Sequence, residues 1–377
     1  MKKFYFAAMM AVLSIALFSC SKGDEAESAI ESYARNFFSA EKAEFKNEAV
    51  PEPTITQPIQ ASMNDMVLAG GQNFINITSP VELEKVIVSM SGQDGYWEVP
   101  VTPTRAEITY TVVLDMGADL SQNMNLQISG VTPNGEVTPA VTCSVKYVES
   151  LSGDLAINLT FSNEKDVDLH VVTPFDFHIF YGNTGVINYV EYQKKYKELM
   201  EDPNFDWNGF NEEEFYKQFL MFGLDHDSNA ACSIDGLNNE NIVFNEDFVC
   251  DGKYTIYLDM YENCNTSSEP TKWGVSARYQ GNLINSGISV GTNPASGEFP
   301  GDEPSNHGRE DISQLKYKVL EFELTGTGRT ADDVKKAIEE ATKNVDEKSE
   351  EYYGPARRPL SSAEKKLELS RTMNMLK

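Results

Sequence analysis

Short alternating runs of β-branched and aromatic residues are the feature that most constrains how this chain can fold. Between residues 51 and 150 such runs recur at residues 74–77, 86–90 and 110–114, and turn signals such as Gly70-Gly71 separate them. Alternation with a period of two is typical of half-buried strands. About seven short strands joined by turns indicate an immunoglobulin-like β-sandwich. We therefore predict this sandwich over residues 51–150.

Residues 151–327 show the same alternation and predict a second, jelly-roll-like β-sandwich. Its expected strands lie near residues 154–161, 167–172, 254–261, 273–279 and 315–322. The expected fold class is therefore mainly β, with two β-sandwich domains.

A helical texture interrupts the second sandwich at residues 187–222. Aromatic and long apolar residues recur there at the spacing of one helix face. They are Tyr192, Tyr196, Leu199, Met200, Phe215, Phe219 and Phe222. We predict a helical insertion in a long loop, with an aromatic stripe that favours internal packing over a ligand platform.

A second helical texture begins at Thr330. Thr330 and Asp333 resemble the capping pair that starts many helices, and Val334, Ile338 and Ala341 then share one face. The pattern predicts a C-terminal helical tail over residues 328–377, which could pack on the sandwich or contact a partner.

The charge balance excludes some classes of function. Lys and Arg number 31 against 58 Asp and Glu, for a formal net charge of -27. Such a chain repels phosphate backbones, so we expect no nucleic-acid partner. Carboxylates are the hard oxygen ligands that divalent cations prefer. An apolar run of roughly 18 residues or more is lacking, so no membrane-spanning helix is expected.

The N-terminus has the features of a secretory signal. Two lysines are followed by an apolar stretch over residues 4–18 and then by Ser19-Cys20. This resembles a bacterial lipoprotein lipobox, although Phe18 is bulkier than the usual residue. The resemblance implies a signal peptide over residues 1–19, cleavage before Cys20, and acylation of Cys20 with fatty acids such as palmitate. Cys20 would then anchor the protein to a membrane.

An acidic segment follows the predicted lipidation site. Residues 21–25 end in Asp24-Glu25 and resemble the surface-export signal of Bacteroidetes lipoproteins. The resemblance implies a place on the outer membrane, facing the cell exterior, with an inward-facing location as the alternative. We expect residues 20–50 to form an acidic tether.

Two acidic clusters in the second predicted sandwich indicate metal binding. Asp166 and Asp168 are two positions apart, so an extended strand places both on one face. Residues 225–241 are rich in Asp and Asn, whose oxygens suit Ca²⁺. The first-choice ligands are Asp225, Asp227, Asn229 and Asp235, and Asp166 and Asp168 join them if the two loops meet.

The acidic loop is not an EF-hand. With Asp225 as position 1, Ala230 occupies the position of the invariant Gly, and Gly236 occupies that of the bidentate Glu. A structural calcium site in the loops of a β-sandwich is therefore the expectation. The alternative is a solvated turn in which Asp and Asn cap their own backbone.

The strand Asp166-Val167-Asp168-Leu169-His170-Val171 is followed by a turn at Pro174 and by an aromatic strand at residues 178–183. In these features residues 153–325 resemble an uncharacterised β-sandwich family of bacterial surface and secreted proteins, related in pattern to pre-peptidase C-terminal-like domains. It implies a binding or accessory module, sometimes stabilised by calcium. The helical insertion departs from the pattern.

Four cysteines remain beside Cys20. An exported chain can form disulfides, and we predict one bridge among Cys232, Cys250 and Cys264, with buried free thiols as the alternative. The sequence does not choose the pairing, and Cys143 could also take part.

Catalytic signals are weak. Residues 287–291 match G-x-S-x-G around Ser289, but a loop follows instead of the helix that a nucleophile elbow needs. We therefore predict a lipid-anchored surface protein that is not an enzyme and that binds a glycan or a protein. The alternatives are a hydrolase or glycan-processing partner, and an envelope or adhesin assembly component.

Overall fold

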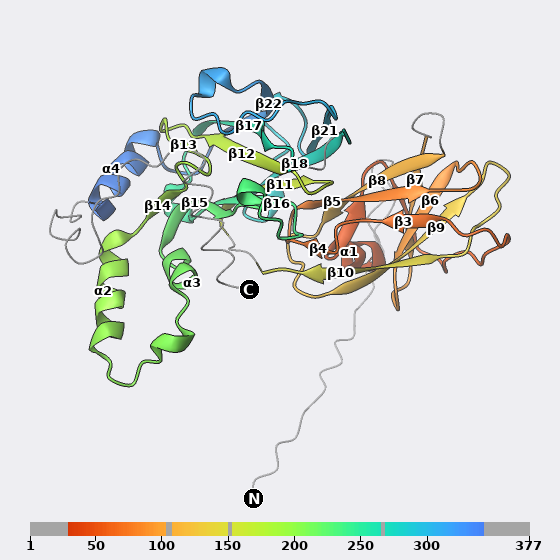
Figure 1. Ribbon diagram of the computed structural model, residues 1–377, viewed down its shortest axis with the longest axis horizontal. Helices are drawn as coiled ribbons and strands as arrows, with labels where there is room; N and C mark the ends of the chain where they lie inside the picture. Colours follow the sequence, from red (N-terminus) through yellow and green to blue (C-terminus); the bar gives the residue numbers. More distant parts are fainter. Residues whose placement is uncertain (1–28, 103–107, 150–152, 265–267, 343–377) are drawn as a thin grey trace, which may run out of the picture.

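The computed structural model describes residues 29–102, 108–149, 153–264 and 268–342. Figure 1 shows two β-sandwiches, one formed by the red-to-yellow part of the chain and one by the green-to-blue part. The predicted mainly β fold class is confirmed. Cys20 lies outside the described residues, so its lipidation stays a prediction. No helix in these ranges is long and apolar enough to cross a membrane.

The first sandwich consists of a four-stranded and a six-stranded sheet. Its four-stranded sheet has the order β1 (Phe38–Ala40), β8 (Thr109–Met116), β5 (Gln72–Thr78) and β3 (Gln60–Ser62). Its six-stranded sheet has the order β2 (Glu44–Lys46), β7 (Tyr96–Pro100), β6 (Lys85–Met90), β9 (Met124–Val131), β10 (Val141–Tyr147) and β4 (Met66–Val67). β4 pairs parallel with β10, and the other pairs are antiparallel. Every second side chain of these strands enters one apolar core.

The prediction of an acidic tether over residues 20–50 is wrong for its second half. Helix α1 (Ala29–Arg35) leads into β1 and β2, which add an edge strand to each sheet. Phe38 is buried, and the ring of Phe45 meets Trp97 edge-on at 5.0 Å. These aromatic side chains gain more by covering the sandwich than by remaining in water, so this segment belongs to the first domain.

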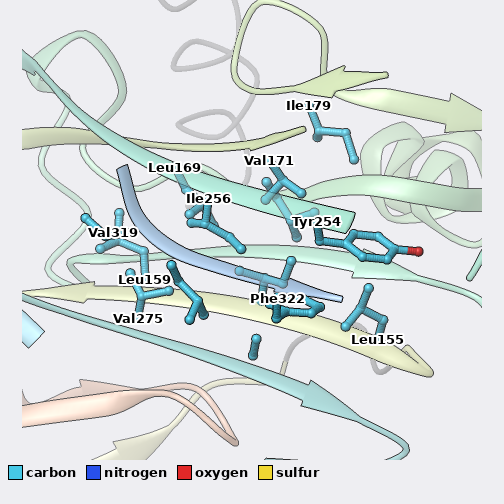
Figure 2. Packing of buried hydrophobic residues seen from close by; sticks show 14 of the residues in the cluster. Leu155, Leu159, Leu169, Val171, Ile179, Tyr254, Ile256, Val275, Val319 and Phe322 are labelled. Carbon is cyan, nitrogen blue, oxygen red and sulfur yellow. The ribbon is translucent and has the colours of Figure 1, made fainter. Parts of the chain in front are cut away.

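The second sandwich, which carries the metal-binding candidates, consists of a seven-stranded and a five-stranded sheet. The seven-stranded sheet has the order β14 (Gly185–Ile187), β15 (Leu220–His226), β16 (Asn239–Phe244), β11 (Leu155–Phe161), β18 (Thr271–Tyr279) and β19 (Asn282–Leu283), and β21 (Ala295–Phe299) also pairs with β18. The five-stranded sheet has the order β13 (His178–Ile179), β12 (Asp166–Val172), β17 (Gly252–Glu262), β22 (Tyr317–Leu324) and β20 (Ile288–Val290). Figure 2 shows Leu159, Leu169 and Phe322 packed in the core between the sheets. Three short 3-10 turns lie in its loops: η2 (Ala230–Cys232), η3 (Glu246–Phe248) and η4 (Ile312–Gln314).

The helical insertion is a hairpin that joins two paired strands. Helices α2 (Tyr189–Glu201) and α3 (Glu212–Lys217), with the turn η1 (Trp207–Gly209), connect β14 to β15. Figure 1 shows the hairpin projecting from the sandwich. Tyr192 is buried among Tyr196, Phe215 and Phe219, so most of the stripe packs internally as predicted. The predicted end of the helical insertion at residue 222 is wrong, because Phe222 lies on strand β15 and packs in the main core.

The C-terminal helix begins at the predicted place. In α4 (Ala331–Thr342), the Thr330 N–H donates to Asp333 Oδ2 at 2.9 Å, and the Asp333 N–H donates to Thr330 Oγ1 at 3.3 Å. This reciprocal pair is a capping box. Val334 is fully buried against the second sandwich, so the helix is part of that domain. The rest of the predicted tail, residues 343–377, lies outside the described residues.

A polar interface joins the two sandwiches. The Gln72 N–H donates to Thr160 Oγ1 at 3.2 Å, and Ser276 Oγ donates to the Gly70 carbonyl at 2.7 Å. A Cβ at Gly274 would lie 1.7 Å from Gln72 Oε1, so only glycine permits this approach. The start of β5 therefore rests on the outer face of β11 and β18 through specific hydrogen bonds.

Candidate metal centre

Three buried carboxylates from two distant segments meet in the second sandwich. Asp166, Asp168 and Asp227 each offer an oxygen, and these oxygens lie within 4.8 Å of one another. Their exposed fractions are 0%, 1% and 3%. The two acidic loops predicted from the sequence do meet in space.

The alternation of β12 produces the first half of this cluster. Val167, Leu169 and Val171 enter the apolar core, so Asp166 and Asp168 lie on the opposite face of the strand. Asp227 follows the end of β15 in the other sheet. The loop that follows β15 therefore reaches β12 and brings together residues that lie about sixty positions apart.

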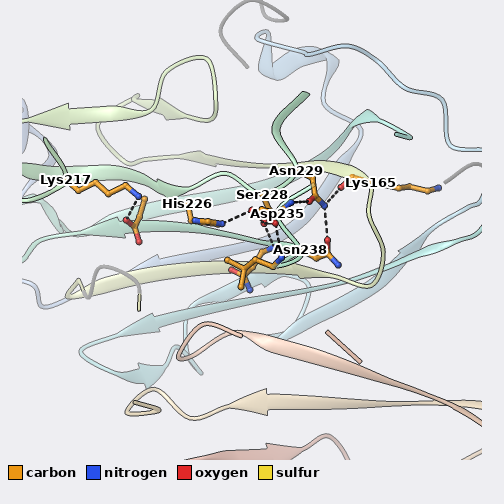
Figure 3. A network of polar contacts seen from close by, with 10 residues as sticks. Lys165, Lys217, His226, Ser228, Asn229, Asp235 and Asn238 are labelled. Atoms are coloured by element: carbon orange, nitrogen blue, oxygen red, sulfur yellow. Dashed lines mark hydrogen bonds and ion pairs between the residues drawn. The ribbon is translucent and has the colours of Figure 1, made fainter. Parts of the chain in front are cut away.

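Asn229 fastens the acidic loop to the start of β12. Its Nδ2 donates to the Lys165 carbonyl at 2.9 Å and to Asn238 Oδ1 at 2.8 Å, as Figure 3 shows. Its Oδ1 accepts the Asp235 N–H at 3.2 Å. Asn229 also takes the left-handed conformation, with φ of 57°, which Asn tolerates better than most residues. We therefore interpret Asn229 as the residue that holds the loop in place and not as a metal ligand.

Asp235 does not belong to the group of three carboxylates and caps its own loop. It accepts hydrogen bonds from Ser228 Oγ at 2.9 Å and from the Leu237 N–H at 2.8 Å, and its Oδ2 lies 3.1 Å from His226 Nε2. Burial raises the pKa of Asp235, but the bonds and charge of His226 with the Leu237 and Ser228 bonds lower it overall. Asp235 therefore follows the alternative prediction, in which Asp and Asn side chains of the turn cap their own backbone.

Asp225 also stands apart from the cluster. Its Oδ2 accepts from Asn241 Nδ2 at 3.2 Å, and its Oδ1 lies 3.7 Å from Lys217 Nζ on α3. Of the four first-choice ligands, the structure brings only Asp227 to the site. The other two carboxylates of the site come from the second-choice ligands, Asp166 and Asp168.

A disulfide fixes the acidic loop from the other side. Cys232 in η2 is bonded to Cys264, which follows β17 after Glu262 and Asn263. β17 is the neighbour of β12, and Asp168 lies opposite Asp259 in their pairing. The bridge therefore ties the loop that carries Asp227 to the sheet that carries the other two carboxylates. The prediction of one bridge among Cys232, Cys250 and Cys264 is confirmed, and Cys143 and Cys250 are free thiols.

Two further acids lie beside the cluster, and neither is among the ligands predicted from the sequence. Glu240 on β16 is buried, and its Oε2 accepts the Leu169 N–H at 2.6 Å. Burial raises the pKa of Asp259 to about 6, although Arg309 opposes this with an ion pair at 2.9 Å. The sequence does contain a signal for Asp259, because this acid interrupts a strand of Tyr, Leu and Met residues.

The cluster suits a hard divalent cation. Two unit charges roughly 5 Å apart repel by about 3 kcal/mol at an effective dielectric constant of ~20. A shared cation or proton removes this repulsion among Asp166, Asp168 and Asp227. Because all three donors are carboxylate oxygens, the set fits Ca²⁺ chemistry, with remaining ligands from backbone carbonyls or water.

The G-x-S-x-G segment has no nucleophile geometry. Ser289 lies on the edge strand β20, and its Oγ donates to Glu321 Oε1 at 2.7 Å. The next described element is the strand β21, where a nucleophile elbow requires a helix. Ser289 is therefore a structural residue of the sheet.

Comparisons with known proteins add little to this geometry. No family model matches the chain, and no curated protein matches it. Among solved structures, the I9-I11 tandem of titin is 9% identical in sequence and aligns with 72% of this chain and 91% of its own length, at a TM-score of 0.14. The residues of this chain alone therefore carry the functional proposal.

Proposed function

We propose that this chain is a lipid-anchored surface protein that binds a ligand without transforming it, and that a structural Ca²⁺ ion stabilises its second sandwich. The observation that carries the proposal is the meeting of Asp166, Asp168 and Asp227 in a buried cluster. Buried like charges are costly unless a cation or proton is shared among them. A bound ion would join β12 to the loop after β15.

The proposed ion has a structural role. It would hold the acidic loop between two fixed points, the Asn229 bond to Lys165 and the Cys232–Cys264 disulfide. A loop that is already restrained loses less conformational entropy on binding the ion. The three carboxylates would hold the cation, and the loop would keep one shape on the protein surface.

The proposed anchor places the first sandwich close to the membrane. Eight residues, 21 to 28, separate the predicted acylated residue from helix α1. A segment of this length spans at most about 30 Å. The domain pair would therefore stay near the outer leaflet while the second sandwich presents its surfaces to ligands.

The helical hairpin supports a binding role. Four of the five exposed large hydrophobic residues in the described ranges lie on it. They are Val190, Met200, Trp207 and Tyr216. Exposed aromatic side chains are enriched at sites where proteins meet ligands.

Calcium dependence is the direct test. At a Ca²⁺ concentration 100 times the Kd, a single site stabilises the folded protein by about 2.7 kcal/mol. We expect Ca²⁺ to raise the melting temperature of the mature chain and EDTA to lower it. Asp227→Asn should remove the response, because it deletes the charge that the loop contributes.

The control is Asp235→Asn, which alters a partly buried acid of the same loop outside the cluster. It should lose some stability through its bonds to Ser228 and Leu237 and keep the full calcium response. An unchanged melting temperature with Ca²⁺ and with EDTA in the unmodified protein would contradict the metal site.

The location has its own test. Growth with a fatty-acid label should label the protein, and Cys20→Ala should remove the label. Protease added to intact cells should digest the surface-exposed protein. Labelling without digestion would indicate an inward-facing lipoprotein, and no labelling would contradict the anchor.

A further inference from the structure

A polar groove lies on the outer face of the seven-stranded sheet. Asn241, Asn158 and Ser276 face one another across β16, β11 and β18, and Val243, Ala156 and Arg278 form the next row. The first sandwich covers the Ser276 end through the Gly70 carbonyl. The helical hairpin covers Val243. The groove remains between these two covers, lined by Ala69, Gly70, Ala118, Asp119, Leu120, Tyr147, Gly153, Ala156, Asn158, Asn241, Arg278 and Gly281.

The floor of the groove holds an amide with unused hydrogen-bonding capacity. Asn158 is 4% exposed, and its Oδ1 has no hydrogen-bond partner among the described residues. Buried amide oxygens nearly always have a partner, because leaving one unpaired is unfavourable. A ligand hydroxyl in the groove would supply the missing donor.

A guanidinium group is held in place at the edge of the same groove. Arg278 Nε lies 3.4 Å from the Gly70 carbonyl, and Nη1 lies 3.3 Å from the Gly281 carbonyl. Within the described ranges no carboxylate forms an ion pair with it; burial lowers the pKa of Arg278, and the charges of Asp115 and Asp119 oppose this only in part. Both bonds join it to backbone, so its remaining N–H groups are oriented before a ligand arrives.

The charges and bonding groups of the groove select a class of ligand. Arg278 only donates hydrogen bonds, Asp119 only accepts them when ionised, and Asn158 can do both. Sugar hydroxyls also donate and accept. The carboxylate of Asp119 on the wall offsets the charge of the single guanidinium, which disfavours an anionic ligand. Tyr147 adds a ring to the wall.

We propose that this groove binds a neutral saccharide. The inference rests on the proposed binding function and assigns it a site and a ligand class. It does not depend on the calcium ion, because Asp166, Asp168 and Asp227 do not line the groove.

Calorimetry with defined oligosaccharides tests this proposal. The probes are neutral hexasaccharides of glucose, mannose and xylose in several linkages, with an oligogalacturonate as the acidic comparison. We expect at least one neutral probe to bind. Arg278→Ala and Asn158→Ala should each weaken that binding at least tenfold, and Arg278→Lys should weaken it less, because it keeps the charge without the planar fork.

Two surface variants serve as controls. Lys253→Ala removes an exposed cation from the other sheet, and Lys335→Ala removes an exposed cation from helix α4. Both should keep the affinity. The melting temperature and calcium response of every variant show that the protein is folded and that the cation site is intact.

Three results would overturn the groove proposal. They are no binding of any neutral probe, binding of the acidic probe alone, and binding that Trp207→Ala removes while Arg278→Ala leaves it unchanged. The last result would place the ligand on the hairpin. If the calcium response persists in each case, the failure concerns the groove and leaves the proposed cation site standing.

Discussion

The two sandwiches share an architecture but bury different chemistry. In the first, the buried polar residues are uncharged, such as Gln72 and Asn73. In the described ranges every buried charged residue lies in the second sandwich, including the cluster at Asp166 and Asp168. The comparison shows that the first domain combines its apolar core with uncharged buried polar groups, whereas the second also buries charges and uses a disulfide and, in our proposal, a cation.

Shortening a buried leucine in either core should have the largest effect on the free energy of unfolding. The two domains should then differ in whether Ca²⁺ offsets the loss. Leu114 and Leu169 are both fully buried, one in each sandwich. Leu114→Ala and Leu169→Ala should each lower the free energy of unfolding of their domain by about 2–5 kcal/mol. Denaturant unfolding followed by hydrogen exchange measures both. Added Ca²⁺ should offset only the Leu169→Ala loss, and equal rescue of both variants would break the comparison.

Loss of the disulfide should come next. Replacing both Cys232 and Cys264 with Ser should cost about 2–4 kcal/mol, because it frees the loop in the unfolded chain and loosens it in the folded one. Chemical denaturation with and without a dithiol reductant measures the effect. Replacing Cys143 with Ser in the first sandwich is the control and should make the protein no more sensitive to calcium removal.

Two buried asparagines give a matched pair with smaller effects. Asn229 holds the acidic loop, and Asn73 accepts the Phe74 N–H and donates to the Asn64 carbonyl in the first sandwich. Either one replaced by Ala should cost about 1–3 kcal/mol, because partners are left unpaired. Titration with Ca²⁺ should show weaker affinity for Asn229→Ala alone. An equal loss of Ca²⁺ affinity in Asn73→Ala would contradict a local role for Asn229.

The smallest effect should come from the cap of α4. Thr330→Ala removes one side of the Thr330–Asp333 box and should cost about 0.5–2 kcal/mol. Thermal unfolding measures the loss, with Thr342→Ala at the other end of the helix as the control. The calcium response should stay unchanged in both, since α4 lies away from the carboxylate cluster.

Local patterns predicted most of the fold. The alternation at residues 74–77 and 254–261 falls within β5 and β17, because one buried face forces a period of two. The capping pair marked the start of α4 for a similarly local reason. The tether was misjudged because the aromatic residues of β1 and β2 find their partners far along the chain, at Met116 and Trp97.

The candidate site depends on contacts that local patterns do not contain. Asp166 and Asp168 share a face by strand geometry, which the sequence indicates. The choice of Asp227 over Asp225 and Asp235 follows from how Asn229 and the disulfide position the loop, and these are contacts between distant segments. Asp259 was not selected because a single acid within an otherwise apolar strand resembles an ordinary strand residue.

The number of calcium ions bound by the metal-free mature chain tests the central proposal most directly. Isothermal titration should give one ion per chain for the unmodified protein, and none for the variant in which Asp166, Asp168 and Asp227 are all replaced by Asn. Asp176→Asn, which alters an exposed acid, should still bind one ion. A folded unmodified protein that binds no Ca²⁺, or a triple variant that still binds one ion, would contradict the account.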